Sequence, residues 1–494
     1  MPENIRALIV ILILSTSLFV IARRSASTII GSENFIRRRN LWFAFTLSAF
    51  LTPNFGVYAL LAIPLLLYTR KRDINIPALY FFLLFALPTL TFTIPGMGLI
   101  NYFIDISHPR ILALFLLLPT FYRLIRQSNT ISFGRTGTEM ALAAYLLLTA
   151  ILYVRDSTVT DTLRHAFYLF LDAFLPYYVI SRSLKDLQQF RDVLLSLVLA
   201  IMLVALFAMF ETARHWLLYV TLVDRLDLQQ GMYNYLERDG LIRARVTAGQ
   251  PIALGYLIAI GMGLYLFVKS HVKSKLIRRL GMGVLAGGLI AALSRGPWVG
   301  MAMLLLIFLA TGRSSVPRLV GFTLTAVLTF SLIAILPGGS KVINLLPFIG
   351  ATEKENVVGR ETLFTNGMIV IQRHPWFGSA HYLDAPEMQA LRTGEDIIDI
   401  VNTYINIALE EGFVGVGLFI AFFSLTLRGI YRALHSLQDK DSEEYLLGRA
   451  LLATLIAILI IIFTVSSITI IPFMYWSVAG LGAAYTQMVR KNTV

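Results

Sequence analysis

Four arginines beside apolar stretches are the residues of this sequence with the clearest chemical potential. They are Arg243, Arg245, Arg295 and Arg360. A cation at a membrane boundary is costly unless it pairs with an acid or reaches water. A guanidinium also binds phosphate through two parallel hydrogen bonds. Each arginine alone fits an ion pair or a headgroup contact, whereas a cluster on one face would bind a lipid-linked phosphate or diphosphate.

A polar stripe precedes one of the apolar stretches. The segment 397–408 reads as the amphipathic start of a helix, with Asp399, Asn402 and Asn406 on one face. Such a stripe would line a cavity, although a carboxylate near a helix N-terminus also offsets the macrodipole. For Glu410 and Glu411 we expect packing and capping roles.

The sequence motifs do not indicate metal or nucleotide chemistry. His374 and His381 lack the spacing of metal ligands, and no HExxH motif occurs. The sequence has neither a P-loop nor a Rossmann fingerprint, and it has no cysteine. We therefore expect no metal, no cofactor and no nucleotide-driven step.

The elements that must position these residues are membrane-spanning helices. The chain has 494 residues, of which 57% are hydrophobic and 14% charged. That is too apolar for a water-facing surface, and long apolar runs in lipid must be helical. The sequence predicts an all-α polytopic transmembrane helical bundle of about 12–15 spans. The expected segments are 5–22, 41–52, 57–69, 77–95, 111–123, 139–154, 163–181, 193–211, 251–268, 280–293, 297–311, 319–336, 405–427, 449–468 and 472–488.

The charge pattern assigns sides to the connecting segments. One set of alternate connections holds 27 of the 42 lysines and arginines but only 8 of the 29 acids, which marks it as cytoplasmic. The net charge of +13 thus indicates a membrane protein with lipid partners rather than a nucleic-acid partner. Two long segments, 212–250 and 337–404, then lie outside as large extracytoplasmic loops. The N-terminus lies outside if the pairs 41–52/57–69 and 280–293/297–311 cross fully, and inside if one pair is a single broken span.

Four patches in fixed order resemble the O-antigen ligase/polymerase superfamily of bacterial membrane glycosyltransferases. The resemblance is strongest over 240–420. The patches are RVTAGQP at 245–251, SRGPW at 294–298, GRETLF at 359–364 with HPWFG at 374–378, and NTY at 402–404 with EEGFVG at 410–415. It implies a GT-C-like bundle located in the bacterial inner (cytoplasmic) membrane, with its active site facing the periplasm.

The resemblance also implies a reaction. A saccharide on undecaprenyl diphosphate would be attacked by an acceptor hydroxyl, and the lipid diphosphate would leave. Preorganised cations would stabilise the charge on that leaving group without a metal. The diphosphate-binding residues would be Arg243, Arg245, Arg295 and Arg360. Sugar-binding candidates are Trp376, Tyr382, Asn402 and Tyr404, although each aromatic ring also fits an interfacial belt.

One departure bears on the mechanism. Members that act as ligases carry a histidine directly before the asparagine of the fourth patch, and here that position is Val401. The base would then be Asp399, His381 or Asp396. Because polymerases follow a looser pattern, the departure favours a polymerase of O-antigen, capsule or exopolysaccharide. A ligase acting on lipid A core or protein is the alternative, and a flippase or transporter is the alternative of another class.

These expectations divide the chain into three regions. Residues 1–240 would be N-terminal transmembrane helices with the first outer loop from about 212. Residues 241–427 would be the core, including the periplasmic loop 337–404. Residues 428–494 would be a cytoplasmic loop and the last helices. The expected partners are the lipid-linked oligosaccharide, membrane lipids and a polysaccharide chain-length regulator.

Overall fold

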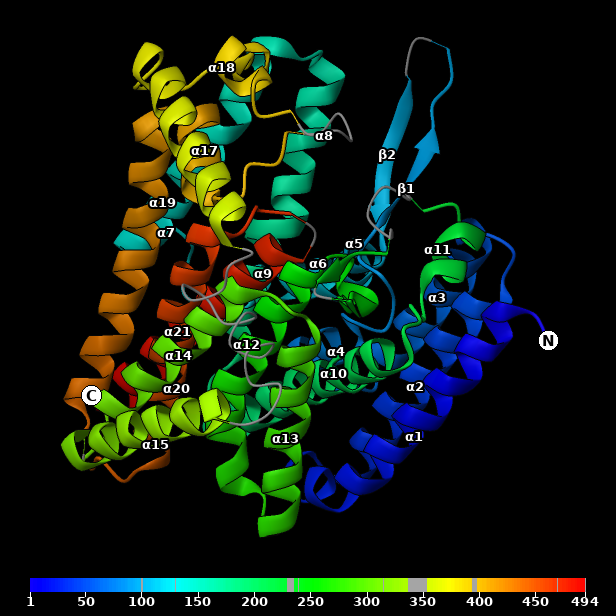
Figure 1. Ribbon diagram of the computed structural model, residues 1–494. Coiled ribbons are helices and arrows are strands. Elements are labelled where there is room, and N and C mark those ends of the chain that lie inside the picture. Colours follow the sequence, from blue (N-terminus) through cyan, green and yellow to red (C-terminus); the bar gives the residue numbers. More distant parts are fainter. Residues whose placement is uncertain are drawn as a thin grey trace. The chain divides into compact units, whose positions relative to one another are not determined.

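The computed structural model describes residues 1–98, 101–128, 130–228, 235–238, 240–313, 315–335, 353–392, 398–468 and 470–493. The chain forms two compact units (Figure 1). The first comprises Met1–Thr130, Phe170–Ser294 and Ile468–Val494, and the second comprises Ile131–Leu169 and Arg295–Ser467. The three-region functional division stays a prediction.

The first unit is helical with two small β-ribbons. Its helices are α1 (Glu3–Ile30), α2 (Ser32–Leu51), α3 (Phe55–Arg70), α4 (Ile76–Leu83), α5 (His108–Leu112), η1 (Ala113–Leu117), α6 (Leu118–Arg126), η3 (Phe170–Phe174), α9 (Leu175–Ser183), α10 (Leu187–Arg214), α11 (Val220–Arg225), η5 (Val246–Ala248), α12 (Pro251–Val268), η6 (Lys269–His271), α13 (Lys275–Ala291) and α21 (Ile471–Thr493). Its strands are β1 (Thr91–Pro95), β2 (Tyr102–Ser107), β3 (Glu237–Arg238) and β4 (Leu241–Ile242), paired antiparallel as β1–β2 and β3–β4.

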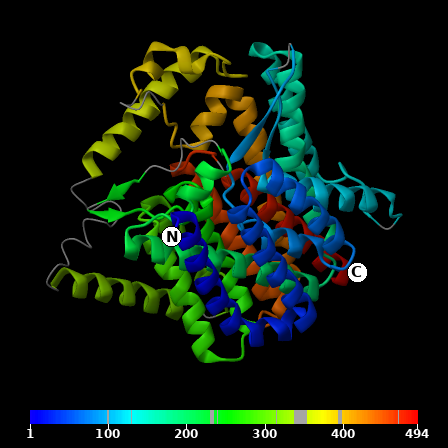
Figure 2. The same ribbon diagram turned by 90° about the vertical axis from the view of Figure 1, so that its right-hand side faces the viewer.

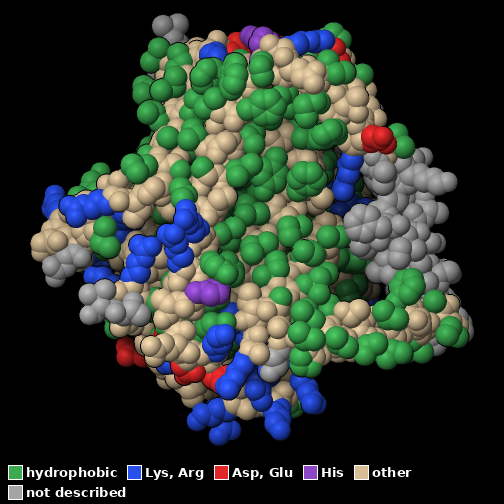
Figure 3. Space-filling view, turned by 90° about the vertical axis from the view of Figure 1, so that its left-hand side faces the viewer, with side chains coloured by type: hydrophobic (Ala, Val, Ile, Leu, Met, Phe, Trp, Pro, Cys, Tyr) green, Lys and Arg blue, Asp and Glu red, His purple; other side chains and the backbone are tan. Residues whose placement is uncertain are grey.

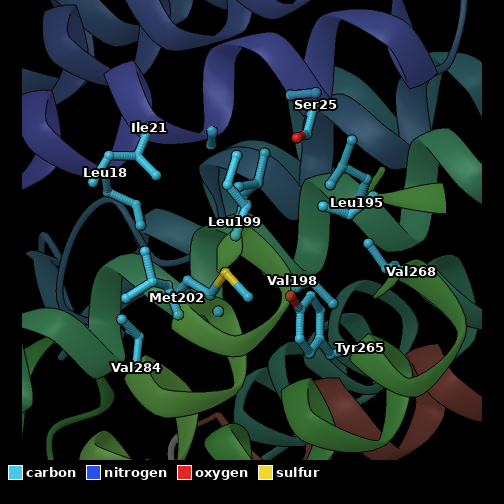
Figure 4. A pocket seen from close by; sticks show the side chains of 16 residues that line it. Leu18, Ile21, Ser25, Leu195, Val198, Leu199, Met202, Tyr265, Val268 and Val284 are labelled. Carbon is cyan, nitrogen blue, oxygen red and sulfur yellow. The ribbon is translucent and has the colours of Figure 1, made fainter. Parts of the chain in front are cut away.

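Helix α10 is the centre of the first unit. It is 28 residues long, buried along most of its length, and packs against α1, α4, α12 and α13. A helix that is apolar all round belongs in such an interior position. A pocket lined almost wholly by apolar side chains lies between α10 and its neighbours, with Leu18, Leu199 and Val284 from three different helices facing it (Figure 4).

A buried ionic cluster ties α2 to α10. The side chain of Arg38 is fully buried and donates to Asp73 Oδ1 and Oδ2 at 2.8 Å each. It also contacts Asp192 and donates to Ser196 Oγ at 3.0 Å. A buried guanidinium is tolerated only when carboxylates and hydroxyls satisfy it in this way. The cluster therefore fixes the packing of these helices.

The second unit contains the remaining elements. They are α7 (Gly137–Leu152), η2 (Tyr153–Asp156), α8 (Val159–Leu169), α14 (Arg295–Ala310), α15 (Ser315–Ile335), α17 (Glu353–Arg373), η7 (Tyr382–Asp384), α18 (Pro386–Gln389), α19 (Thr403–Ser436), α20 (Glu443–Ile461) and η8 (Ile462–Thr464). Helix α19 packs along α7 and α20, and α14 packs on α20. A small apolar core that includes Leu363, Tyr382, Met388 and Leu409 joins α17, η7 and α18 to the start of α19.

The all-α membrane class is confirmed. Within the described ranges, eight helices are long and apolar enough to cross a membrane by length and composition: Glu3–Ile30, His108–Arg126, Gly137–Asp156, Leu187–Arg214, Pro251–His271, Ser315–Leu332, Thr403–Ser436 and Glu443–Thr464. Two further apolar helices, α3 and α14, are shorter. Hydrophobic side chains cover much of the face in Figure 3, as a lipid-facing surface requires. The count of 12–15 spans stays a prediction.

One expected span is wrong. The segment 77–95 holds only the eight-residue helix α4 and then strand β1, which pairs with β2 in a projecting ribbon (Figure 1). The alternating threonine and apolar residues of β1 favour a strand. Thr93 Oγ1 also donates across the ribbon to Asp105 Oδ1 at 2.6 Å.

Candidate functional site

The segment that precedes the first patch meets the end of α13 within the first unit. The short β3–β4 ribbon (green arrows in Figure 2) leads into Arg243, whose Nη2 donates to Ser294 Oγ at 3.0 Å. On the same ribbon Arg238 Nη1 donates to the carbonyl of Leu293 at 2.7 Å. The backbone N–H of Ala244 donates to the carbonyl of Ala291 at 3.2 Å. The turn after α13 is thus hydrogen-bonded to the arginine-bearing ribbon.

Positive charge accumulates along this ribbon. Burial, together with the neighbouring cations Arg238 and Arg245, lowers the pKa of Arg243 to about 10. The guanidinium remains protonated at pH 7, so like charges are held close together in a partly desolvated place. An anion bound there would relieve that repulsion.

A buried carboxylate holds the turn that follows. Glu211, in the last turn of α10, is fully buried. Its Oε2 accepts the backbone N–H groups of Arg245 at 3.0 Å and Val246 at 3.1 Å, and its Oε1 accepts that of Leu218 at 2.9 Å. Val246 has φ 49°, a strained conformation for a β-branched residue. Glu211 therefore sets the backbone that carries Arg245, whose side chain is itself buried.

The other two predicted arginines belong to the second unit. Arg295 is half-buried and begins α14, and Arg360 is exposed on α17. The convergence of all four arginines on one ligand therefore remains a prediction. Within the first unit, Arg243 contacts the turn ending at Ser294, and Arg245 lies two residues further along the chain.

The third and fourth patches dock onto each other at backbone level. Helix α19 breaks at Gly412, which has φ 69° and ψ −169°. The freed N–H groups of Phe413 and Val414 donate to the carbonyls of Pro375 at 2.7 Å and Trp376 at 3.2 Å. A Cβ on Gly412 would lie 2.3 Å from the backbone of Trp376. Only glycine fits both this conformation and this approach.

An arginine that the sequence did not single out closes the junction. Arg155 donates from Nη1 to the carbonyls of Phe377 at 2.8 Å and Gly378 at 3.0 Å. Its Nη2 donates to the carbonyl of Glu410 at 2.7 Å. The N–H of Ser379 donates to the carbonyl of Leu409 at 2.9 Å. The carbonyls released by the break in α19 are thus satisfied from the 375–379 segment and from Arg155.

A pocket of about 310 Å³ lies at this junction. Its lining residues are Thr149, Leu152, Tyr153, Arg155, Asp156, Ser157, His165, Ser379, Ala380, Tyr382, Glu410 and Glu411. The Tyr382 hydroxyl donates to Glu410 Oε1 at 2.9 Å, and Thr149 Oγ1 donates to Glu411 Oε1 at 2.8 Å. Burial, together with the Glu410 carboxylate, raises the pKa of Tyr382 well above its usual value. Tyr382 therefore stays a hydrogen-bond donor at physiological pH.

The residues expected to supply a base lie near the surface. His381 is exposed, with Nδ1 3.3 Å from Asp384 Oδ2 and Nε2 3.5 Å from Asp156 Oδ1. Asp399 is exposed and accepts a hydrogen bond from Ser466 Oγ at 2.7 Å. Asp396 lies outside the described residues.

The expected polar stripe is wrong in its geometry. Helix α19 begins at Thr403, and the Asn402 side chain caps it by accepting the N–H groups of Tyr404 at 2.9 Å and Ile405 at 3.2 Å. Asp399 precedes the cap in non-helical backbone, so it does not share a helix face with Asn402 and Asn406. The capping preference of asparagine outweighs continuation of the helix.

The sugar-binding candidates have different surroundings. Tyr382 lines the pocket, whereas Tyr404 donates its hydroxyl to the carbonyl of Leu459 at 2.9 Å. Trp376 is 68% exposed. No group of three or more metal-ligating side chains occurs in the part of the chain that the structure describes.

No sequence motif singles out Glu211 or Arg155 as site residues. Both act on backbone groups brought from distant parts of the chain. The one available hint was a charged residue at the end of an apolar stretch in each case.

Comparison with known proteins identifies one region. Residues 280–420 match the family model described as O-antigen ligase. This range covers the second to fourth patches, including the junction between 374–378 and the break in α19. No curated protein matches the chain.

Proposed function

We propose that this chain, whose residues 280–420 match the O-antigen ligase family model, polymerises saccharide repeat units carried on undecaprenyl diphosphate. Ligase- or polymerase-type glycosyl transfer in general follows from the family. The product of the proposed polymerisation would be O-antigen, capsule or exopolysaccharide. The site would face the periplasm from the inner membrane, where the charge pattern assigns the long outer segments.

In the proposed reaction, a hydroxyl of the acceptor saccharide attacks the anomeric carbon of the donor. The bond from that carbon to the diphosphate oxygen breaks, and the lipid diphosphate leaves. Arg243, Arg245, Arg295 and Arg360 would stabilise the charge on the leaving diphosphate. The hydroxyl proton would pass to a base, for which Asp399 and His381 are the candidates.

The observation that carries the proposal is the charged ribbon joined to the second patch. Arg243 lies beside Arg238 and Arg245 at a lowered pKa, hydrogen-bonded to Ser294. The charge of these neighbouring cations would favour a bound anion. A diphosphate supplies two phosphate groups, which suits recognition by several guanidinium groups.

The choice of a polymerase over a ligase rests on Val401. A valine cannot accept a proton, so the acceptor would be activated differently from the ligases that carry histidine there. Ligation to lipid A core or protein is the alternative within the class. Transport of the lipid-linked sugar without bond formation is the alternative of another class.

Product analysis separates these functions. The purified chain in lipid nanodiscs would be supplied with undecaprenyl-diphosphate-linked repeat units, with and without lipid A core. A ladder of lengthened lipid-linked glycan supports the polymerase, whereas transfer only to lipid A core supports the ligase. In sealed proteoliposomes, movement of the lipid-linked sugar with no new glycosidic bond would overturn both. Adding a chain-length regulator should change the ladder's length distribution only.

A further inference from the structure

We propose that the pocket at the break in α19 binds a neutral or amino sugar through the carboxylates of Asp156, Glu410 and Glu411. The pocket lies wholly within the second unit. Identifying this sugar as part of the acceptor saccharide rests on the proposed function. Sugar binding itself does not.

The pocket is built from four separated segments of the chain. They are the end of α7 with η2, helix α8, the 379–382 segment and the start of α19. The junction is held rigidly, because Phe413 and Ser379 donate across it and Arg155 bonds both sides. A preformed concave site with several polar groups is the usual setting for small-ligand recognition.

The hydrogen bonds of Arg155 affect which charged groups of the pocket remain available to a ligand. All three guanidinium nitrogens donate to backbone carbonyls, since Nε also bonds Leu152 at 2.9 Å. Backbone carbonyls therefore occupy the donors of Arg155, whose charge lies near Glu411, and the three carboxylates of the pocket outnumber this one cation. Carboxylates accept hydrogen bonds from sugar hydroxyls or an ammonium group. They would repel the carboxylate of a uronic acid.

One carboxylate oxygen in this pocket makes no well-formed hydrogen bond. Glu411 is 4% exposed and its Oε1 accepts from Thr149; the side chains of Tyr145 and Arg155 lie near the carboxylate, but its Oε2 accepts no hydrogen bond of good geometry. A buried acceptor left unsatisfied is costly, and a donor from a ligand would remove the cost. Glu410 is held in place by the hydroxyl of Tyr382.

The pocket also has an aromatic wall. The rings of Tyr153 and His165 stack with centroids 4.1 Å apart and planes within 1°. Tyr153 is 43% exposed, so part of its surface is open. Flat aromatic surfaces beside acceptors suit a sugar ring, which has apolar C–H faces and polar edges.

Binding can be measured without any lipid-linked donor. The probes are methyl glucosaminide, methyl glucoside and methyl glucuronide, observed by saturation-transfer NMR with the full chain in nanodiscs. We expect the glucosaminide to bind at least as well as the glucoside, and the glucuronide at least tenfold more weakly. Glu410→Gln should weaken glucosaminide binding by about tenfold, because a charged acceptor is lost. Asp439→Asn, at an exposed turn in the same unit, should leave binding unchanged.

A second variant guards against misfolding. Ala380→Phe fills the pocket from an exposed loop position and should abolish binding while the melting temperature stays near that of the wild type. Absence of probe binding, equal binding of the glucuronide, or unchanged binding in both Glu410→Gln and Ala380→Phe would overturn the proposal. If probes bind as expected but no polymer forms, the proposed function fails and the sugar pocket stands. If polymer forms but no probe binds, the pocket fails alone.

Discussion

The carboxylate of Glu211 accepts the backbone N–H of Arg245 at 3.0 Å, and with it that of Val246 at 3.1 Å. A buried acid at the end of α10 thus fixes the strained turn from which Arg245 projects. The relationship joins a residue of the apolar interior to one of the proposed diphosphate ligands. Positioning of this kind matters because a misplaced cation stabilises a leaving group poorly.

Replacing Glu211 should therefore impair both stability and activity. Glu211→Gln is isosteric but presents an amide to backbone donors, and Glu211→Ala leaves three buried N–H groups unpaired. We expect Glu211→Ala to lower the free energy of unfolding by on the order of 3 kcal/mol. For Glu211→Gln we expect a fall in kcat with a smaller loss of stability.

Thermal unfolding in nanodiscs and polymer assays would check these expectations. Glu444→Gln, in the first turn of α20, serves as the control. A Glu211→Ala protein with wild-type melting temperature and activity would show that the three hydrogen bonds are dispensable.

Diphosphate binding should depend on pH through Arg243. Its folded-state pKa of about 10 lies below the usual arginine value, so its positive charge is complete at pH 7 and is lost as pH rises through 10. Above pH 10, loss of the Arg243 cation should weaken anion binding. The same deprotonation removes repulsion between like charges, so it should increase the free energy of unfolding of the unliganded protein.

The measurement compares undecaprenyl diphosphate affinity in the wild type and Arg243→Gln across pH 8 to 11. We expect a wild-type advantage of about tenfold at pH 8, the scale of a charge-assisted hydrogen bond, that narrows as pH passes 10. A constant ratio across the range would mean that Arg243 does not contact the diphosphate or does not titrate there.

The break in α19 offers a matched pair of glycines. Gly412→Ala places a Cβ against the backbone of Trp376 at a residue with φ 69°, so we expect undocking of 374–378 and a melting temperature lowered by several degrees. Gly417→Ala lies in the same helix with open space around it and should be neutral or slightly stabilising. Proteolysis near 374–392 should increase only in Gly412→Ala. Equal behaviour of the two variants would contradict the docked junction.

The candidate bases can be compared directly. Asp399→Asn and His381→Ala each keep the helix cap at Asn402 and the pocket at Tyr382 intact. We expect the variant lacking the true base to lose 10²–10⁴-fold in kcat, as loss of general base catalysis does. In that variant, the activity that remains should no longer fall as the pH is lowered. Normal activity in both variants would remove both residues from this role.

Several of these features were predictable because they are local. Apolar run length indicated the helical membrane class, and three of the four patches lie in the region 280–420 that matches the O-antigen ligase family model. The arginines at 243 and 245 stand out by their place before a span, and their diphosphate-binding role stays a prediction. The stripe including Asp399 failed because Asn402 caps the helix, and the span at 77–95 failed because β1 pairs with β2.

The remaining features depend on contacts between distant segments. Glu211 binds backbone 34 residues away, and Arg155 binds carbonyls 222 to 255 residues away. No periodicity or motif indicates such pairings. Each side chain hydrogen-bonds to backbone N–H or C=O groups, and these groups do not depend on the residue type. The roles of Glu410 and Glu411 in a pocket likewise depend on the break at Gly412. The sequence alone suggested only packing and capping for them.

The most direct test is a double-mutant cycle between Arg243 and Arg360, read by undecaprenyl diphosphate affinity. Arg360→Lys is included because a point charge cannot reproduce a bidentate fork, and it should fail nearly as badly as Arg360→Ala. Two arginines on one diphosphate should show a coupling free energy of about 1 kcal/mol or more in the Arg243→Gln/Arg360→Ala cycle. Additive losses, or wild-type affinity in Arg360→Ala, would contradict a shared diphosphate site.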